Sequence, residues 1–239
     1  NTDCRSERNI TAMIQILKGF APLAALAGAA LVTGCDNMNI HIGDGDGVPL
    51  AELDMSGAAP TELVLAGPEK VIVTEGEKLD IAVSGEDAAV DAVRFSLDEG
   101  SLGLSRAKDM GKIGGVATVR VTMPSLTAMV LAGSGDIEAA SMRGKADVTI
   151  AGSGKAKVAR FDADSLDLTI AGSGSFEGAG TVDMLDMTVA GSGKADMAGL
   201  KVGNADISVA GSGDAEFASD GKVDASIMGS GTITVNGRA

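Results

Sequence analysis

The feature that most constrains the fold of this chain is a Gly-Ser-Gly sequence that occurs six times in the C-terminal half. Successive copies begin 19, 20, 19, 20 and 18 residues apart. So regular a period is typical of stacked coils, in which each repeat packs against its neighbours. The copies are Gly133-Ser134-Gly135, Gly152-Ser153-Gly154, Gly172-Ser173-Gly174, Gly191-Ser192-Gly193, Gly211-Ser212-Gly213 and Gly229-Ser230-Gly231. The repeat predicts a solenoid in which these segments form the structural turns.

Aligning the coils on their glycines separates the side chains into alternating columns. Positions two, four and six before the first Gly are mostly apolar, and alternate residues of a strand share a face, so we expect these columns to point into the core. They hold Leu131, Ile150, Ile170, Val189, Val209 and Ile227; Met129, Val148, Leu168, Met187, Ile207 and Ala225; and Thr127, Ala146, Leu166, Leu185, Ala205 and Val223. About 20 residues per coil fits an all-β parallel β-helix, in which each strand pairs with its counterpart one period away.

The intervening positions are predicted to point outward. Five before the first Gly, an aspartate recurs in five successive coils, and three before it the side chains are Val130 and then threonine or serine. Strands lie about 4.8 Å apart, so the carboxylates would form a row on the order of 20 Å long, whose mutual repulsion raises pKa values or recruits cations. The row is the candidate ligand site, with weak Ca²⁺ binding as one alternative and a solvated face that discourages sheet stacking as the simpler one. Its members are Asp147, Asp167, Asp186, Asp206 and Asp224.

Composition excludes several function classes. The formal charge of −14 opposes nucleic-acid binding, and the one histidine, His41, excludes a Ser-His-Asp triad or a multi-histidine metal site in the repeats. Grouped carboxylates could serve a polysaccharide-acting hydrolase or lyase, and this enzyme stays an alternative. The aspartates follow the repeat instead of interrupting it, however, and Tyr and Trp platforms for sugars are absent. We therefore expect no catalytic residue, no cofactor and no enzyme activity.

The N-terminus has the order of features found in an export signal. Lys18 precedes an apolar run, residues 20–32, that is short for a membrane span, and the run ends in a segment, Leu31 to Cys35, that resembles the lipobox of bacterial lipoproteins. We expect residues 1–34 to be a signal peptide, with Met13 as a plausible true start, and Cys35 to carry the lipid. A buried helix is the alternative. A lipid anchor implies the cell envelope, on the periplasmic side of the inner membrane or at the outer membrane.

Three segments are expected after the signal. Residues 35–49 centre on alternating Gly and Asp and are predicted to be a flexible tether. Residues 50–123 contain short β-branched runs separated by turn residues, which predict strands at 63–65, 71–73, 79–83, 93–97 and 116–121. We interpret them as irregular first coils that cap the solenoid, with a separate β-sandwich as the alternative. Residues 124–239 are the regular coils.

The repeat also resembles a known family. The phrases Val130-Leu131-Ala132-Gly133-Ser134-Gly135-Asp136 and Thr169-Ile170-Ala171-Gly172-Ser173-Gly174 are similar to the repeated phrase of bacterial GIN-domain proteins, described as autotransporter adhesin heads. The resemblance covers about residues 50–238. It implies a right-handed β-helix and carries over no catalytic residue. We therefore expect an envelope lipoprotein that acts as a structural, adhesion or binding module toward a protein or glycan partner, with its oligomeric state open.

Overall fold

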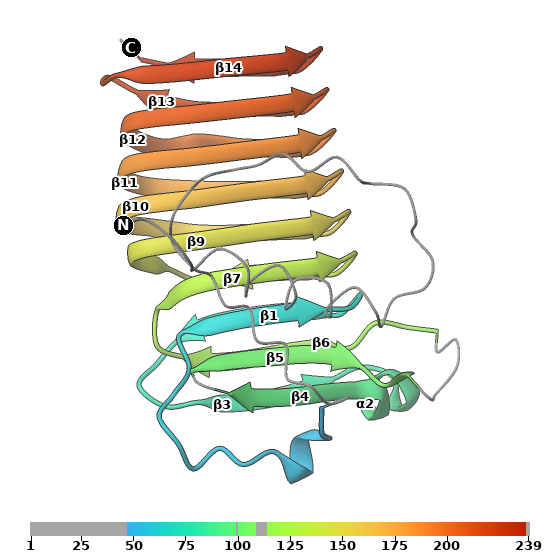
Figure 1. Ribbon diagram of the computed structural model, residues 1–239. Coiled ribbons are helices and arrows are strands. Elements are labelled where there is room, and N and C mark those ends of the chain that lie inside the picture. The colour runs from blue at the N-terminus through green and yellow to red at the C-terminus, as the bar shows by residue number, and fades with distance from the viewer. Residues whose placement is uncertain (1–46, 99, 109–113, 238–239) are drawn as a thin grey trace, which may run out of the picture. The chain divides into compact units, whose positions relative to one another are not determined.

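The computed structural model describes residues 47–98, 100–108 and 114–237. Its strands form one hydrogen-bonded sheet of 15 strands that winds into stacked coils (Figure 1). The predicted parallel β-solenoid is confirmed. No helix in the part of the chain that the structure describes is long and apolar enough to cross a membrane. The expected signal segment and Cys35 lie outside the described residues.

The regular coils follow the Gly-Ser-Gly period. Each long strand begins directly after one copy and ends at the first Gly of the next, and each pairs in parallel with the strand one period away. The pairing is in phase, because Gly152, Gly172, Gly191 and Gly211 are successive partners. The strands are β7 (Leu126–Gly133), β8 (Asp136–Ala139), β9 (Met142–Gly152), β10 (Lys155–Gly172), β11 (Ser175–Gly191), β12 (Lys194–Gly211), β13 (Asp214–Ser219), β14 (Val223–Gly229) and β15 (Thr232–Asn236).

Backbone contacts explain why glycine occupies the corner. Gly191 has φ of +120°, a conformation that disfavours side chains, and a Cβ added there would overlap the carbonyl oxygen of Gly172 in the coil before. That oxygen accepts a hydrogen bond from the N–H of Ser192 at 2.8 Å. The same bond joins Ser212 to Gly191 at 2.8 Å. The corners are thus linked by backbone bonds, and within the described residues no hydrogen bond from the hydroxyls of the repeat serines is found.

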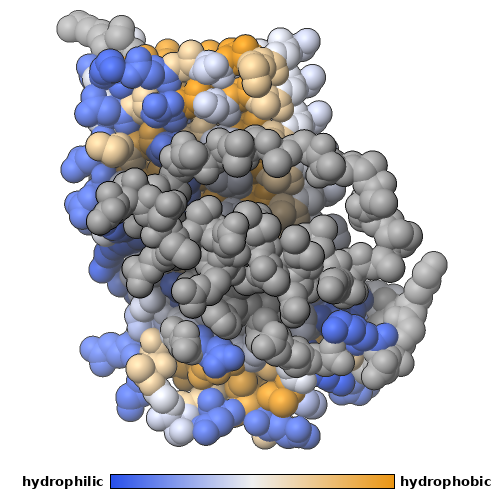
Figure 2. Space-filling model, viewed as in Figure 1, coloured by the Kyte–Doolittle hydropathy of each residue, from blue (hydrophilic) through white to orange (hydrophobic). Residues whose placement is uncertain are grey.

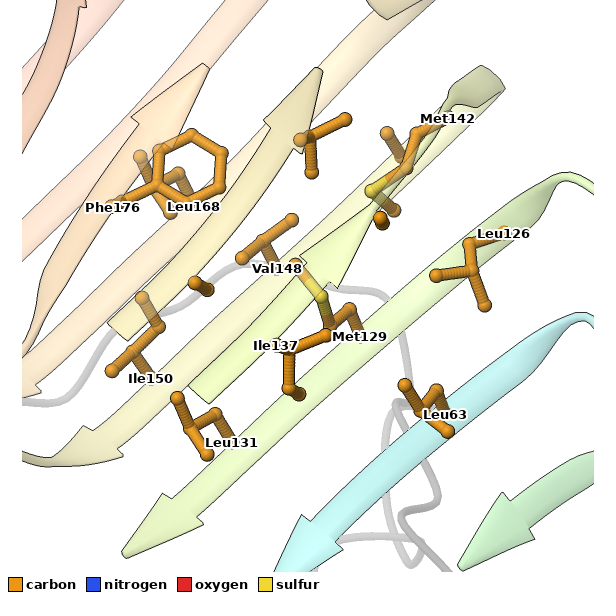
Figure 3. Packing of buried hydrophobic residues seen from close by; sticks show 14 of the residues in the cluster. Leu63, Leu126, Met129, Leu131, Ile137, Met142, Val148, Ile150, Leu168 and Phe176 are labelled. Carbon is orange, nitrogen blue, oxygen red and sulfur yellow. The ribbon is translucent and has the colours of Figure 1, made fainter. Parts of the chain in front are cut away.

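The predicted core columns are buried through most of the coils. Figure 3 shows Met129, Val148 and Leu168 on neighbouring strands, and all three are fully buried. Phe161 and Phe176 pack within the same interior with ring centroids 6.1 Å apart. Burial of this continuous apolar column supplies the main driving force for stacking the coils.

Two positions of the first regular coil depart from the predicted alternation. Thr127 was expected in the core but is exposed, because the register shifts between Leu126 and Ala128 and Leu126 is buried instead. Val130 was expected to face solvent but is 7% exposed, and it pairs with Val64, which is 5% exposed. Both of these corrections fall where the regular coils meet the irregular ones. In the last coil Ala225 and Ile227, also expected in the core, are exposed because no further strand of the described chain covers β14.

The strands before Met123 include all five predicted runs, within two residues at either end. One strand and two short helices have no counterpart in the sequence prediction, namely β5, α2 and the 3-10 helix η2. The elements are η2 (Leu50–Glu52), β1 (Glu62–Ala66), β2 (Lys70–Glu75), β3 (Asp80–Ser84), α2 (Asp87–Ala92), β4 (Val93–Asp98), β5 (Ser101–Arg106) and β6 (Thr118–Met123). Val48, near the end of the predicted tether, bonds to Phe95 through two backbone hydrogen bonds of 2.8 Å.

These irregular strands do not stack in chain order. β1 lies between β5 and β7, and β2 lies between β6 and β8. The coil formed by β1 and β2 comes first in the sequence, but in the stack it follows the coil formed by β5 and β6. β3 pairs antiparallel to β6, and β4 antiparallel to β5. Figure 1 shows β3, β4 and α2 together at the end of the stack where the chain enters. The antiparallel strands therefore end the parallel stack at its N-terminal side.

Candidate binding face

The register brings the five predicted aspartates into one column. Asp147 pairs with Asp167, Asp167 with Asp186, Asp186 with Asp206 and Asp206 with Asp224. We call this set the acidic column. Since neighbouring strands lie about 4.8 Å apart, each carboxylate in the column has another one or two at close range.

Two more columns run beside the acidic column on the same outward side of the strands. A hydroxyl column, two residues further along each strand, consists of Thr149, Thr169, Thr188, Ser208 and Ser226. An alanine column, two residues further again, consists of Ala151, Ala171, Ala190 and Ala210. We call the three columns together the binding face. It is a repetitive surface of small side chains bordered by carboxylates.

Burial and mutual repulsion raise the pKa values of Asp147, Asp167 and Asp186 in this column. Partial burial raises the pKa of the Asp147 carboxyl to about 6, and the charges of Asp167 and Glu62 add to the rise. The pKa of Asp167 is raised by burial and then by Asp186. The pKa of Asp186 is raised in the same way by burial and by Asp206. Ionised carboxylates are thus held here at an energetic cost, as expected for like charges in adjacent strands.

Basic partners for the column are scarce among the described residues. Lys222 lies 2.6 Å from Asp224, and no other salt bridge to the column is found in residues 47–98, 100–108 and 114–237. Lys222 also interacts electrostatically with Asp206, so Asp147, Asp167 and Asp186 are the members of the column with no basic partner among the described residues. Their charge is available to an external cationic group.

The strands after each Gly-Ser-Gly corner carry a contrasting surface, which we call the charged face. Its outward positions mix lysines with acids: Lys70 lies 2.7 Å from Glu138, Lys157 lies 3.3 Å from Glu177, and Lys155 also pairs with Glu177. The hydrogen bond from Lys155 lowers the pKa of the Glu177 carboxyl. Much of the charge on this face is thus neutralised within the protein.

One acidic residue near the column was missed by sequence reasoning. Glu62 pairs with Ala128, and Ala128 pairs with Asp147. Glu62 therefore lies on the line of the acidic column, two strands from Asp147, and Ala128 occupies the position between them. The signal was present in the sequence, because Leu63-Val64-Leu65-Ala66-Gly67 has the same pattern as Met129-Val130-Leu131-Ala132-Gly133. It was hidden because Pro68 replaces the serine of the repeat.

The described residues offer few other sites. Residues 47–98, 100–108 and 114–237 contain no group of three or more His, Cys, Asp or Glu side chains arranged to hold a metal ion. The phenylalanines Phe95, Phe161, Phe176 and Phe217 are buried, so they provide no exposed ring for a sugar. A shallow groove of about 220 Å³ lies on the charged face near Lys194, Asp214 and Thr232, away from the acidic column.

A second polar cluster, which the sequence did not indicate, joins an irregular coil to a regular one. The Ser141 hydroxyl donates to Glu75 at 2.8 Å, and Arg143 lies 3.0 Å from the same carboxylate. These contacts link β2 to the start of β9. The Glu75 carboxylate that accepts from Ser141 is also paired with Arg143, so we interpret the cluster as a structural link between coils.

Three solved structures share this fold at low sequence identity. A crystal structure described as a "putative adhesin" from Bacteroides fragilis NCTC 9343 has a TM-score of 0.62 and 18% identity, over 74% of this chain and 92% of that chain. A "putative lipid binding protein" from Parabacteroides distasonis ATCC 8503 has a TM-score of 0.52 and 20% identity, over 74% and 93%. A "putative adhesin" from the same strain has a TM-score of 0.50 and 18% identity, over 75% and 93%.

The chain matches a protein family but no curated protein. The profile of the family described as "Putative auto-transporter adhesin, head GIN domain" matches residues 59–239, which span the irregular coils as well as the regular ones. With the solenoid, the Gly-Ser-Gly corners and this match over most of its length, the chain belongs to the GIN-domain family.

Proposed function

We propose that this protein is a lipid-anchored component of the bacterial cell envelope that binds a macromolecular partner across the binding face. The partner presents cationic groups to the acidic column and packs against the hydroxyl and alanine columns beside it. The family description, an adhesin head, supports an adhesion or binding role. The protein is not an enzyme in this proposal, because the family and the structures that share its fold are described as adhesins or binding proteins.

One observation carries the proposal, namely the contrast between the two outward surfaces. Lysines on the charged face neutralise Glu138 and Glu177 within the protein, whereas Asp147, Asp167 and Asp186 have no such neighbour among the described residues. Aligned like charges destabilise adjacent strands, so a surface with no role would gain from lysines like those on the charged face. An external cationic partner would offset this repulsion and gain affinity from it.

Binding can be tested with variants that remove the same charge from either surface. The protein is screened against envelope glycans and individually purified envelope proteins, and every hit is measured at two salt concentrations. Asp167→Asn, Asp186→Asn and Asp206→Asn combined should weaken binding about tenfold or more and reduce its salt dependence. The matched control, Glu138→Gln, Asp196→Asn and Glu216→Gln, should leave affinity within about twofold.

Three results would contradict the proposed binding mode. Equal losses in both triple variants would show that only net charge matters. Depolymerisation of an acidic polysaccharide that disappears in Asp186→Ala and Asp206→Ala would make the protein an enzyme. Calorimetry that detects Ca²⁺ binding at millimolar concentration, abolished by the same substitutions, would make the acidic column a cation site.

The anchor rests on the segment ending in Cys35, and it has a separate test. If Cys35 carries the lipid, Cys35→Ala should move the protein from the membrane fraction to the soluble fraction. Ser134→Ala, an exposed hydroxyl removed from a corner of the solenoid, serves as the control and should leave the distribution unchanged. Membrane retention of Cys35→Ala would exclude lipidation at this residue.

A further inference from the structure

The C-terminal end of the solenoid presents two strands with an unpaired side. Among the described residues, β14 pairs only with β12 and β15 only with β13, whereas β10, β11 and β12 have strands on both sides. In the described part of the chain nothing pairs with the outer edges of β14 and β15. Their backbone N–H and C=O groups on that side form a template for another strand.

The sequence of this last coil lacks the features that normally protect an edge. No charged residue and no proline occurs between Asp224 and Arg238. Where earlier coils carry Lys194 or Asp214 on the charged face, the last coil has Thr232. Natural edge strands that face water usually carry charges, prolines or bulges, so an edge whose one charged strand residue, Asp224, lies near the start of β14 indicates a surface that is covered.

Apolar side chains are exposed at the same end. Ile227 is 45% exposed and Met228 is 73% exposed, whereas Val209, one coil earlier in the column of Ile227, is 2% exposed. In Figure 2 hydrophobic colour gathers over the last coils, at the top of the view. A further strand stacked on β14 would bury the side chain of Ile227, as β14 buries that of Val209.

The two ends of the solenoid differ, and this difference selects the geometry of association. On the N-terminal side the outermost strands, β3 and β4, run antiparallel to the stack, with α2 between them in the chain, so this side presents no parallel coil for a C-terminal end to continue. Head-to-tail stacking, which would build a filament, is therefore disfavoured. When the same surface of two copies forms the contact, the interface is isologous and the product is a two-fold dimer.

We propose that two copies of this chain associate end to end, with β14 of one copy pairing antiparallel to β14 of the other about a two-fold axis at Ser226. Ser226 is the central residue of β14, so this register pairs the strand over its full length. Ala225, in a core column, then lies opposite Ile227 of the second copy, and the small and large side chains complement each other. Even-numbered residues keep facing outward on both copies.

Charge also favours this arrangement. Continuing the parallel stack would place another carboxylate beside Asp224, as happens between Asp206 and Asp224. In the antiparallel register, Asp224 instead lies opposite Met228 of the second copy, and the acidic column is not extended across the interface. The uncharged residues from Ala225 to Gly237 supply most of the contact, so the large net negative charge of each copy is kept away from it.

Cysteine cross-linking of the full chain in its native membrane tests the dimer. The Cα atoms of directly opposed residues in an antiparallel pair lie about 4.5–5.5 Å apart, within the range of a disulfide. Ser226→Cys should therefore give a cross-linked dimer under mild oxidation. Ser208→Cys is the matched control, because Ser208 is also exposed in the same column but lies one coil away from the edge.

Each result decides the proposal. A dimer band in Ser226→Cys that is absent from Ser208→Cys and from the unsubstituted chain supports it. No band in Ser226→Cys, or equal bands in both variants, overturns it, and monomers found by sedimentation at every concentration overturn it as well. A charge pair adds a second measurement: Ser226→Lys and Ser226→Asp should each weaken the dimer about tenfold, and mixing the two variants should restore association.

Discussion

At the scale of single residues, Asp147 is the position where burial and charge repulsion act together. Its carboxyl titrates near pKa 6 in the folded protein, above the ordinary value of 3.8. The folded state therefore holds a proton at pH 5 that the unfolded state has released. Where the folded state binds more protons than the unfolded state, the free energy of unfolding falls as pH rises. Ionisation of Asp147 therefore lowers the free energy of unfolding from about pH 4 upward, and the full loss is reached above pH 6.

Asp147→Asn should remove this cost. We expect a gain in the free energy of unfolding of about 1 kcal/mol at pH 7, after allowing for solvent screening of a half-exposed group, and no gain at pH 4. Urea denaturation at the two pH values measures it. Asp196→Asn on the charged face is the control and should show no such gain, because Asp196 lies 3.9 Å from Lys194. A gain that is equal at both pH values would contradict the assigned cause.

At the scale of the coil, the corner decides where one unit ends and the next begins. Gly172 and Gly191 occupy the same place in successive coils and pair directly. Every column between them is continued by the following coil, since Leu185, Asp186 and Met187 pair with their counterparts in β12. A coil is therefore a unit that can be removed without changing the register of the others.

Deletion of residues 172–190, one whole coil of 19 residues, should leave a folded protein. Ala171 would then join Gly191, and all columns stay aligned, although loss of Phe176 and its contact with Phe161 lowers stability by about 2–4 kcal/mol. Circular dichroism and a cooperative urea transition measure this outcome. The control, deletion of residues 172–181, removes half a coil and should abolish cooperative unfolding. Loss of cooperativity in both would show that the coils are not interchangeable.

At the scale of the whole molecule, the N-terminal coils are interwoven and not merely stacked. Because β5 lies outside β1, the chain must pass the first coil, form β3, α2 and β4, and return to place β5 against β1. A buried ion pair joins the two crossing segments: Arg106, at the end of β5, lies 2.7 Å from Glu69, whose side chain is fully buried just before β2. Arg106 also donates to the Gly115 carbonyl at 3.1 Å.

Glu69→Ala should therefore destabilise the protein far more than removal of an exposed ion pair. Removing one partner of a buried pair leaves the other charge partly desolvated, and we expect a loss of about 3 kcal/mol in the free energy of unfolding. Glu138→Ala breaks the exposed pair with Lys70 and should cost less than about 1 kcal/mol. Thermal unfolding of both variants measures the difference. Similar losses would mean that Glu69 does not hold the crossing segments together.

The regular half of the fold could be predicted from the sequence because its signals are local and repeated. A glycine that must adopt positive φ recurs with the period of the coil, and alternation on either side then assigns each residue to the core or the surface. This reasoning was wrong where the period breaks: Thr127 is exposed because a register shift brings Leu126 into the core. The acidic column follows from the same register, since five aspartates at one phase must lie on one line.

The remaining features depend on contacts between segments far apart in the chain, which only the tertiary structure decides. Strand order is one of them, because neither β1 nor β5 carries a local signal for its neighbour, and apolar faces of similar width allow several orders. The addition of Glu62 to the acidic line and the burial of Val130 follow from that order. The sequence by itself determined the coil, its corner and the column of carboxylates, because each is set within one period. The tertiary structure decided which strands form each end of the stack and that those at the N-terminal end run antiparallel, because that depends on where the chain turns back on itself.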